Sequence, residues 1–270
     1  MGTGCDTIIA QFAADVLETP IDNISVYGVD TDISPYDSGS YASSTTYLTG
    51  MAAVKACEQL REHIIALAAA RMNKDASALT FDGENVIDES DGSKMSLFDI
   101  ATASMCNNEI SMEVTYSHSS PVSPPPFMAA CAEVEVDPET GAIELLDYTA
   151  CVDCGTVVNT NLARVQTEGG LLQGIGMTLY EDIWYDERGK NLSNSFMQYK
   201  VPSRLDTDRI RVEFDSSYEP TGPFGAKSIG EIVINTPAPA IADAVYNATG
   251  VWINELPITP EKILKGMQVI

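Results

Sequence analysis

Apolar positions recur at helical spacing in several segments of the chain. Asp6 fits an N-cap, and Ile8, Phe12 and Val16 follow it on one helical face. A longer apolar stripe predicts a helix over residues 45–72. Shorter stripes predict further helices over residues 97–105, 162–180 and 237–248, and a last short one opened by Pro260.

Alternating apolar and polar positions predict strands. The clearest pair, residues 128–136 and 142–152, flanks Asp-Pro-Glu-Thr-Gly, which is typical of a hairpin turn. Asp82-Gly83 indicates a second hairpin. Shorter alternations predict strands at residues 24–29, 111–117, 181–185, 210–214 and 252–256. Because helices and strands mix without regular alternation, we expect an α+β fold.

A proline-rich segment divides the chain. Residues 119–126 end in three consecutive prolines and are typical of a rigid loop between lobes. The sequence therefore predicts a first lobe at residues 1–122 and a second at residues 127–270. With 270 residues, each lobe is long enough to bury a core.

Composition narrows the classes of partner. The chain is 44% apolar and 20% charged, which is typical of a globular protein, and its net charge is −24. This charge argues against nucleic acid or an anionic membrane as a partner. The acidic surface serves solubility or, alternatively, docks a partner. Without a signal-peptide pattern or a bilayer-spanning apolar run, we expect a cytoplasmic protein.

The six cysteines include one close pair. Cys151-Val-Asp-Cys154 has the spacing of a redox pair or of half a zinc site. The chain has no second such pair and only two histidines, His63 and His118, which argues against zinc or iron–sulfur ligation. We expect reduced, structural thiols.

The segment 224–231 reads Phe-Gly-Ala-Lys-Ser-Ile-Gly-Glu and precedes an apolar run. Gly225 and Gly230 allow close backbone approach to a ligand, and Lys227 can offer a cation to a phosphate. Beside a buried run, Glu231 would lose solvation, which would raise its pKa towards that of a general base. The alternative is that the glycine and the glutamate only mark the start of a helix.

Three other runs are equally rich in small residues. Gly-Thr-Gly occupies residues 2–4, Ser-Tyr-Ala-Ser-Ser-Thr-Thr residues 40–46, and Gly-Gly-Leu-Leu-Gln-Gly-Ile-Gly residues 169–176. Hydroxyls, backbone N–H groups and helix N-termini bind phosphate and pyrophosphate. Four such runs on a cation-poor chain indicate a large anionic cofactor held mainly by backbone.

In order and spacing these motifs resemble the molybdopterin-binding part of the xanthine oxidase family of molybdenum hydroxylases. The matching motifs lie at residues 2–4, 42–46, 152–155, 173–176 and 227–231, and the resemblance extends to about residue 250. It implies a two-lobed molybdopterin-binding domain and covers the second half of the family's molybdenum subunit. Some bacterial members divide that subunit over two chains, and this chain is similar to the medium subunit of nicotinate dehydrogenases.

The resemblance implies hydroxylation of an N-heteroaromatic compound with water-derived oxygen. Glu231 matches the family's catalytic base, which takes the proton of a molybdenum-bound hydroxide as that oxygen attacks an electron-poor carbon. Hydride passes to a sulfido or selenido ligand, and the pterin dithiolene, with no direct protein ligand, holds the metal. Nicotinate, purines and aldehydes all stay open as substrates. A non-catalytic scaffold is the alternative, against which the intact Glu231, Gln173 and Lys227 argue.

The remaining site residues also follow from the resemblance. Gln173 matches an amide at the molybdenum end of the cofactor, and Tyr41 and Ala42 fall near substrate. Thr3 stands where the family usually has Gln, so its contact is expected to be shorter or water-mediated. The alternative for Gln173 is a glutamine on a helix surface, and the alternative for Tyr41 is a surface loop tyrosine. For the hydroxyl run at residues 43–46 the alternative is an ordinary N-cap cluster. The implied cofactor contacts are Thr3, Gly4, Ala42, Ser43, Ser44, Thr45, Thr46, Gln173, Lys227, Ser228 and Gly230.

The implied assembly is a complex of several chains. Half a cofactor pocket and no iron–sulfur cysteine set imply a second molybdopterin-binding subunit, an iron–sulfur subunit and an FAD subunit. The cofactor is molybdopterin with molybdenum, as such or as a dinucleotide. The strand that precedes the first motif in the family is expected on another chain or ahead of this sequence.

Overall fold

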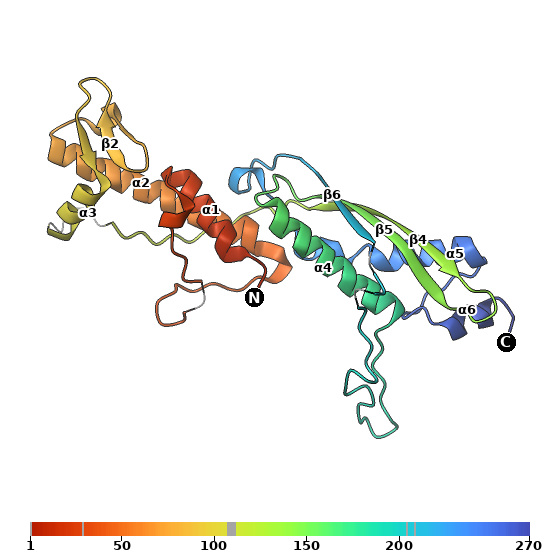
Figure 1. Cartoon of the computed structure of the whole chain (residues 1–270). Helices are drawn as coiled ribbons and strands as arrows, with labels where there is room; N and C mark the ends of the chain where they lie inside the picture. The colour runs from red at the N-terminus through yellow and green to blue at the C-terminus, as the bar shows by residue number, and fades with distance from the viewer. Residues whose placement is uncertain (1, 29, 107–111, 204, 208) are drawn as a thin grey trace. The chain divides into compact units, whose positions relative to one another are not determined.

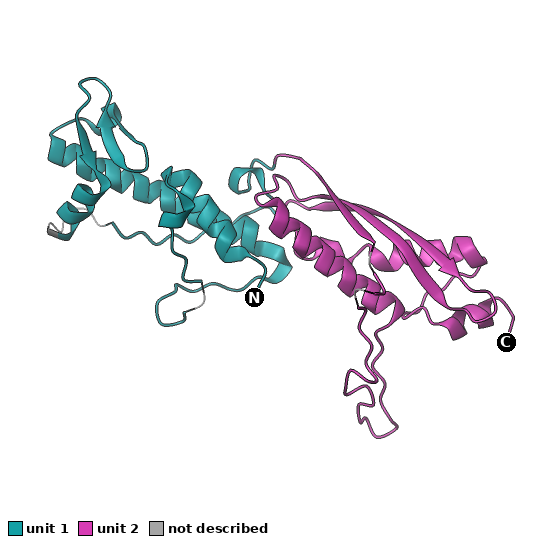
Figure 2. Ribbon diagram, in the orientation of Figure 1, with its two compact units in different colours: residues 1–123, 219–226 teal, residues 124–218, 227–270 magenta. Residues whose placement is uncertain are grey.

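The computed structural model describes residues 2–28, 30–106, 112–203, 205–207 and 209–270. It divides into two compact units (Figure 2). The first comprises Met1–Ser123 with Glu219–Ala226, and the second Pro124–Tyr218 with Lys227–Ile270. The interval 127–270 expected for the second lobe thus includes a segment that the structure groups with the first unit.

Two helices form one end of the first unit. Helix α1 (Cys5–Leu17) packs against α2 (Gly50–Met72) and against the π-helical turn Thr45–Thr49 that leads into α2. A Cβ on Gly50 would lie 2.6 Å from the buried Phe12 ring, so a glycine is needed there. Phe12 also stacks on Phe224 at 5.7 Å between ring centroids, which explains why residues 219–226 belong to this unit.

The far end of α2 carries a small sheet. Strands β1 (Leu79–Phe81), β2 (Asn85–Asp88) and β3 (Lys94–Ser96) pair antiparallel in chain order, and α3 (Leu97–Cys106) follows (Figure 1). The backbone N–H groups of Glu84 and Asn85 donate to Asp82, which confirms the predicted hairpin. The buried core consists of Ile64, Leu67, Ala68, Ala69, Leu79, Phe81, Val86 and Ile100.

A second three-stranded sheet organises the second unit. Strands β4 (Phe127–Val136) and β5 (Ile143–Asp153) pair antiparallel, whereas β6 (Ile210–Asp215) runs parallel to β5. A parallel pair needs a crossover, and α4 (Thr160–Leu179) provides it. The segment 180–209 between α4 and β6 has no regular element in its described residues, apart from one isolated bridge.

Helices cover one face of this sheet. Helix α4 packs against β6 and α5 (Pro237–Thr249), and α5 packs against β4 (Figure 1). Helix α6 (Pro260–Gly266) follows near the end of the chain. The core combines strand and helix residues with Ile258, which lies just before α6. Its buried members are Leu145, Tyr148, Ala150, Val212, Leu171, Ile175, Ile241, Val245, Ile258 and Ile263.

The α+β class is confirmed, and all the predicted helices form within a few residues of their expected bounds. Three short predicted strands are wrong: residues 24–28, 112–117 and 252–256 are irregular, and residues 29 and 111 lie outside the described part. The expected strand at 181–185 is wrong as well, since only Tyr185 pairs there, with Asn191. Alternation alone does not make a strand, because a strand needs a neighbouring backbone to pair with.

Short 3₁₀ turns complete the described elements: Ile21–Asn23, Tyr41–Ser43, Ala76–Ala78, Pro223–Gly225 and Ile232–Ile234. None of the helices in the described part of the chain combines the length and the apolar character that crossing a membrane requires.

Candidate functional site

Lys227 ties the Glu231 loop to the end of β5. Its ammonium group donates to Asp153 Oδ2 at 2.7 Å, and its backbone N–H donates to the carbonyl of Cys154 at 2.7 Å. Its Nζ also lies 5.3 Å from the centroid of the Phe127 ring. Only 8% of the Lys227 side chain is exposed. In this structure Lys227 therefore acts as an internal tie, whereas the sequence predicted a cation offered to a phosphate.

Asp153 is built to stay ionised. Its Oδ1 accepts hydrogen bonds from Ser217 Oγ at 2.7 Å and from the Gly155 N–H at 2.9 Å. Burial raises the pKa of Asp153, but the hydrogen bonds from Lys227, Ser217 and Gly155 outweigh burial and hold the pKa below its ordinary value. The Lys227 charge is thus compensated within the second unit.

Beyond Lys227 the loop lies against α4. The Gly230 carbonyl accepts a long hydrogen bond, 3.5 Å, from Gln166 Nε2, and Ser228 and Gly230 are half-buried. Glu231 caps the 3₁₀ turn Ile232–Ile234 and is exposed. The expected burial of this carboxylate is not seen, because Val233 takes the buried position of the turn.

Glycines on α4 allow this close packing. A Cβ on Gly170 would lie 2.2 Å from Val233 Cγ2, and a Cβ on Gly174 would lie 2.5 Å from Pro237 Cγ. Any larger residue would push the turn away from the helix. The small-residue run of the sequence is therefore a packing surface, and it fixes the Glu231 turn against the helix that carries Gln173.

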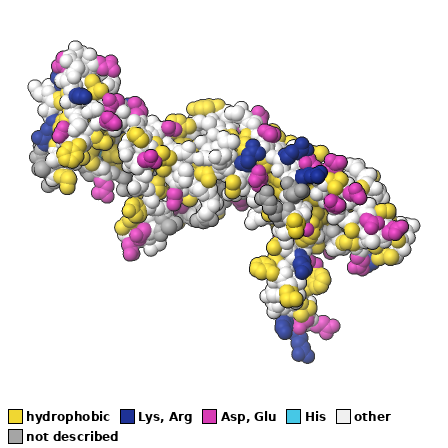
Figure 3. All heavy atoms as spheres, viewed as in Figure 1, with side chains coloured by type: hydrophobic (Ala, Val, Ile, Leu, Met, Phe, Trp, Pro, Cys, Tyr) yellow, Lys and Arg dark blue, Asp and Glu magenta, His cyan; other side chains and the backbone are white. Residues whose placement is uncertain are grey.

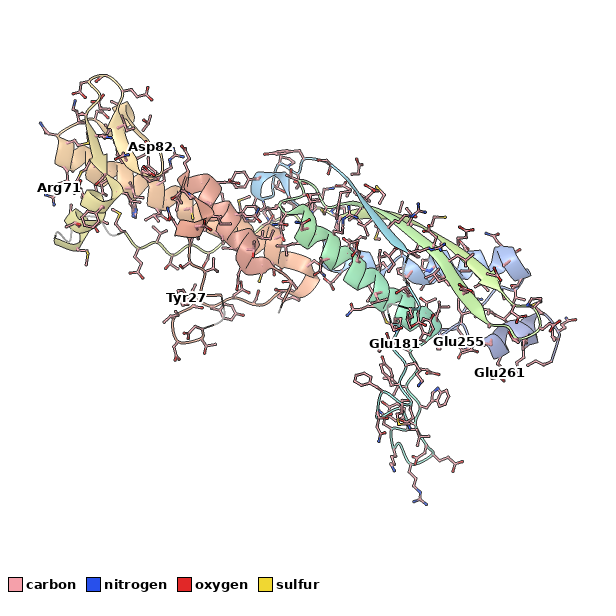
Figure 4. The ribbon with its side chains drawn as sticks, in the orientation of Figure 1. Tyr27, Arg71, Asp82, Glu181, Glu255 and Glu261 are labelled. Carbon is pink, nitrogen blue, oxygen red and sulfur yellow. The ribbon has the colours of Figure 1, made fainter. Side chains whose placement is uncertain are left out.

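Gln173 is exposed and lines an open pocket of about 460 Å³ in the second unit. Tyr199 Oη donates to the Glu181 carboxylate at this pocket, and that hydrogen bond raises the pKa of Tyr199. Glu181 lies where α4 passes into the following loop (Figure 4). The sequence did not indicate Glu181 or Tyr199, since their pairing depends on how an irregular loop folds back. The lining residues are Leu172, Gln173, Met177, Glu181, Tyr199, Val201, Pro202 and Ile234.

The first unit holds the other predicted contacts. Gly4 is the N-cap of α1 with φ 79°, and Thr3 beside it is exposed. Ala42 and Ser43 adopt positive φ values of 49° and 57°. Such values are costly for residues with a Cβ and gather at ligand-binding sites. Tyr41 is 67% exposed.

The hydroxyl run already has some local partners. Ser40 Oγ and Thr45 Oγ1 lie 2.5 Å apart, and Ser44 Oγ donates to the Gly39 carbonyl at 3.4 Å. No side-chain oxygen caps the π-helical turn that begins at Thr45, or α2 behind it. Backbone N–H groups at this helix start, together with the hydroxyls of Ser43 and Thr46, fit an anionic phosphate.

The two groups of residues belong to different units. Thr3, Gly4 and the 41–46 run lie in the first unit, whereas Gln173 and the 227–231 loop lie in the second. The Phe224–Glu231 motif passes from one to the other between Ala226 and Lys227.

The thiols and acids that the structure describes do not gather into a direct metal site. Among the described residues, no group of three or more His, Cys, Asp or Glu side chains is placed to bind a metal ion. Cys151 is exposed and Cys154 is buried, and both thiols are free. Burial, with Asp153 nearby, raises the pKa of Cys154 to about 11, so its thiol stays protonated near neutral pH.

Comparison with known proteins places this geometry in a family. Residues 1–208 match the model of the molybdopterin cofactor-binding domain. The probable hypoxanthine oxidase XdhD of Escherichia coli K12 is 39% identical over 272 residues, which cover 100% of this chain and 28% of that protein. Subunit gamma of the 6-hydroxypseudooxynicotine dehydrogenase complex of Paenarthrobacter nicotinovorans is 32% identical, covering 99% of this chain and 35% of that one.

A solved structure has a similar fold. Quinoline 2-oxidoreductase from Pseudomonas putida 86 superposes with a TM-score of 0.85 at 28% identity, covering 99% of this chain and 35% of that chain. The chain thus spans about a third of the length of these relatives. It belongs to the molybdopterin cofactor-binding domain family, within the xanthine oxidase family of molybdenum hydroxylases.

Proposed function

We propose that this chain is the molybdopterin-binding component of a molybdenum hydroxylase. The complete enzyme hydroxylates an N-heteroaromatic compound with water-derived oxygen and passes the electrons to iron–sulfur and flavin subunits. The observation that carries this proposal is the contact between Gly170 and Val233, because it locks the Glu231 turn onto the helix that bears Gln173. Family membership indicates the cofactor to which this carboxylate and this amide are offered.

Each candidate site residue of the second unit has a defined role. Glu231 is the base that takes the proton of the reacting water. Gln173 both donates and accepts through its amide, and so orients an oxo group or a pterin edge. Lys227 and Asp153 hold the loop in place. Ser228 and Gly230, in the same loop, contact the pterin. When bound, molybdopterin supplies a molybdenum centre that activates water and accepts two electrons.

The first unit supplies anion-binding and substrate contacts. The hydroxyls of Ser43, Ser44, Thr45 and Thr46, with the N–H groups at the start of the π-helical turn Thr45–Thr49, hold the cofactor phosphates. Thr3, Gly4 and Ala42 bring backbone close to the cofactor. Tyr41 and Ala42 face the substrate, where an exposed phenol can stack on a heteroaromatic ring.

Relatives support the substrate class. They are named for hypoxanthine, 6-hydroxypseudooxynicotine and quinoline, which all contain a nitrogen heterocycle. We therefore propose an N-heteroaromatic substrate, with nicotinate as the first compound to test. Another relative of 32% identity is named an aldehyde oxidoreductase, so aldehydes belong in the same screen.

We also propose the partners. Several relatives are named as one subunit among others, such as a subunit gamma and a large subunit. The complex would contain a second molybdopterin-binding subunit, an iron–sulfur subunit and an FAD subunit, in the cytoplasm. The net charge of −24 argues against nucleic acid or an anionic membrane as a partner.

Replacement of the base tests the proposed function. In the purified complex, Glu231→Gln keeps the shape of the side chain but removes its proton affinity, so the rate of enzyme reduction by substrate should fall by about 10²–10⁴-fold. Molybdenum content should not change. The matched control is Glu255→Gln, an exposed glutamate of the same unit (Figure 4), which should leave the rate unchanged.

Two outcomes would contradict the proposal. A Glu231→Gln complex with full molybdenum and a normal rate would assign the base to another group. A wild-type complex without molybdenum would favour a non-catalytic scaffold.

A further inference from the structure

A long irregular arm leaves the second unit between α4 and β6. The arm is defined here as residues 182–209. Its first part extends away from the sheet and its helices (Figure 1), whereas Tyr199 and Pro202 lie beside α4 and the Arg209 carbonyl accepts the Tyr148 N–H of β5. Connections in α/β units usually need about 2–6 residues, and structureless loops beyond about 12–15 residues are uncommon and often functional. The length of the arm therefore requires an explanation that the crossover does not provide.

Local hydrogen bonds give the arm a defined shape. The Leu192 N–H donates to the Trp184 carbonyl at 2.8 Å, and the Trp184 N–H donates to Ser193 Oγ at 3.0 Å. The Asp186 N–H donates to the Lys190 carbonyl at 3.0 Å, which closes the tip. The arm is thus a folded hairpin-like element, although Tyr185–Asn191 is the one β-bridge among its described residues.

The surface of the arm is unusually apolar. Trp184, Tyr185, Phe196, Met197 and Leu205 are each between 61% and 96% exposed. Hydrophobic side chains gather along the arm in the space-filling view (Figure 3). Clusters of large exposed apolar side chains mark surfaces that another protein covers, and aromatic residues and Met are enriched at such interfaces.

The charge of the arm differs from that of the rest of the chain. Its sequence holds five Lys or Arg and five Asp or Glu residues, so its net charge is zero, whereas the whole chain carries −24. A neutral arm can approach a protein of either charge without the repulsion that the remaining acidic surface would exert on an acidic one. This favours a protein partner with an apolar docking surface over a basic or an acidic polymer.

We propose that the arm docks the part of the molybdenum subunit that lies outside the region matched by this chain. The inference rests on the proposed function. This chain accounts for 28% to 35% of its relatives, which carry the matched region within much larger polypeptides. The remaining protein must pack against the matched region, and the arm presents exposed aromatic side chains to it. The occupant is thus a molybdopterin-binding polypeptide that covers the exposed side chains of Phe196 and Met197.

Site-directed photo-crosslinking in the intact complex tests this assignment. A benzophenone-bearing phenylalanine analogue replaces Phe196, and in a separate variant it replaces Tyr27, an exposed aromatic of the first unit (Figure 4). The analogue at position 196 should crosslink to a polypeptide that mass spectrometry identifies as another molybdopterin-binding sequence. The analogue at position 27 should crosslink to it at least tenfold less.

A second variant pair measures the strength of docking. The double variant Phe196→Ser, Met197→Ser should weaken retention of that polypeptide at least tenfold, because it removes two exposed apolar anchors and no core residue. The control Tyr27→Ser should leave retention unchanged. Circular dichroism of each variant checks that the chain still folds.

Three results would overturn the inference: a crosslink from position 196 to a second copy of this chain, a crosslink to the first unit of the same copy, or no crosslink. Molybdenum content and substrate oxidation of the wild-type complex test the proposed function separately. A fully active, molybdenum-containing complex whose arm crosslinks elsewhere would therefore refute the arm assignment alone.

Discussion

Lys227 and Asp153 show how single residues hold the candidate catalytic loop. Their ion pair is mostly buried, with 8% and 17% of the two side chains exposed, and it joins positions far apart in the sequence. Removal of one partner of a buried pair leaves the other charge uncompensated, which is costly. Two exposed ion pairs, Lys265–Glu261 in α6 and Lys55–Glu58 in α2, contribute far less to stability.

We predict that Lys227→Met lowers the free energy of unfolding of the second unit by about 3 kcal/mol. The matched control Lys265→Met removes an exposed ion pair and should cost less than about 1 kcal/mol. Urea denaturation measures the free energy of unfolding of both variants. Protection of the β5 amides against hydrogen exchange shows whether the change lies in the second unit. Equal losses of unfolding free energy in the two variants would show that the buried Lys227–Asp153 pair stabilises the fold no more than an exposed pair does.

The same pair sets a pH dependence. The folded pKa of Asp153 lies below its unfolded value of about 3.9, so the carboxylate stabilises the fold above that pH. This stabilisation is lost as the pH falls below about 4 towards the folded pKa. The difference in stability between wild type and Asp153→Asn should therefore shrink at acid pH.

At the scale of elements, α4 and the turn Ile232–Ile234 form one packed pair. The glycine-rich run that indicated a cofactor motif also lets a helix and a turn approach closely. Two adjacent glycines differ sharply: Gly170 faces Val233, whereas a Cβ on Gly169 would meet nothing within 4 Å. This difference gives a matched test within one helical turn.

We predict opposite effects of alanine at these two positions. Gly169→Ala should stabilise the second unit by about 0.5–1 kcal/mol, because it removes the entropy cost of a helical glycine. Gly170→Ala should destabilise it by about 1–3 kcal/mol, because the new methyl group displaces Val233. Thermal unfolding measures both, and a stabilising Gly170→Ala would contradict the packing described here.

At the scale of the whole molecule, each unit buries its own hydrophobic core around its own sheet. The excess of 39 acidic over 15 basic residues acts on both units. Such an excess keeps a protein soluble and destabilises its compact state by repulsion between like charges.

We predict that salt stabilises this chain. Raising NaCl from 10 mM to 200 mM shortens the screening length from about 30 Å to below about 10 Å, so the melting temperature should rise. NaCl is preferred over sulfate, because sulfate also strengthens apolar burial by its exclusion from the protein surface. A melting temperature that falls or stays constant would show that local ion pairs outweigh the net repulsion.

Most elements could be predicted from the sequence alone. The helices over residues 5–17, 160–179 and 237–249 follow from periodicity, and the β4–β5 hairpin follows from Asp-Pro-Glu-Thr-Gly at its turn. The irregular segment 252–256 shows the limit of such patterns. Its apolar alternation resembles a strand, but a strand also requires a paired neighbour, which depends on the path of distant segments.

The sequence by itself determined the α+β class, the order of the small-residue runs and the family, because local spacing carries these features. Only the tertiary structure decided that Lys227 pairs with Asp153, that Val233 rather than Glu231 is buried, and that Glu181 meets Tyr199. It also decided that the arm presents its aromatic side chains to solvent. Burial and pairing depend on residues brought together from far along the chain, and no local pattern contains that information.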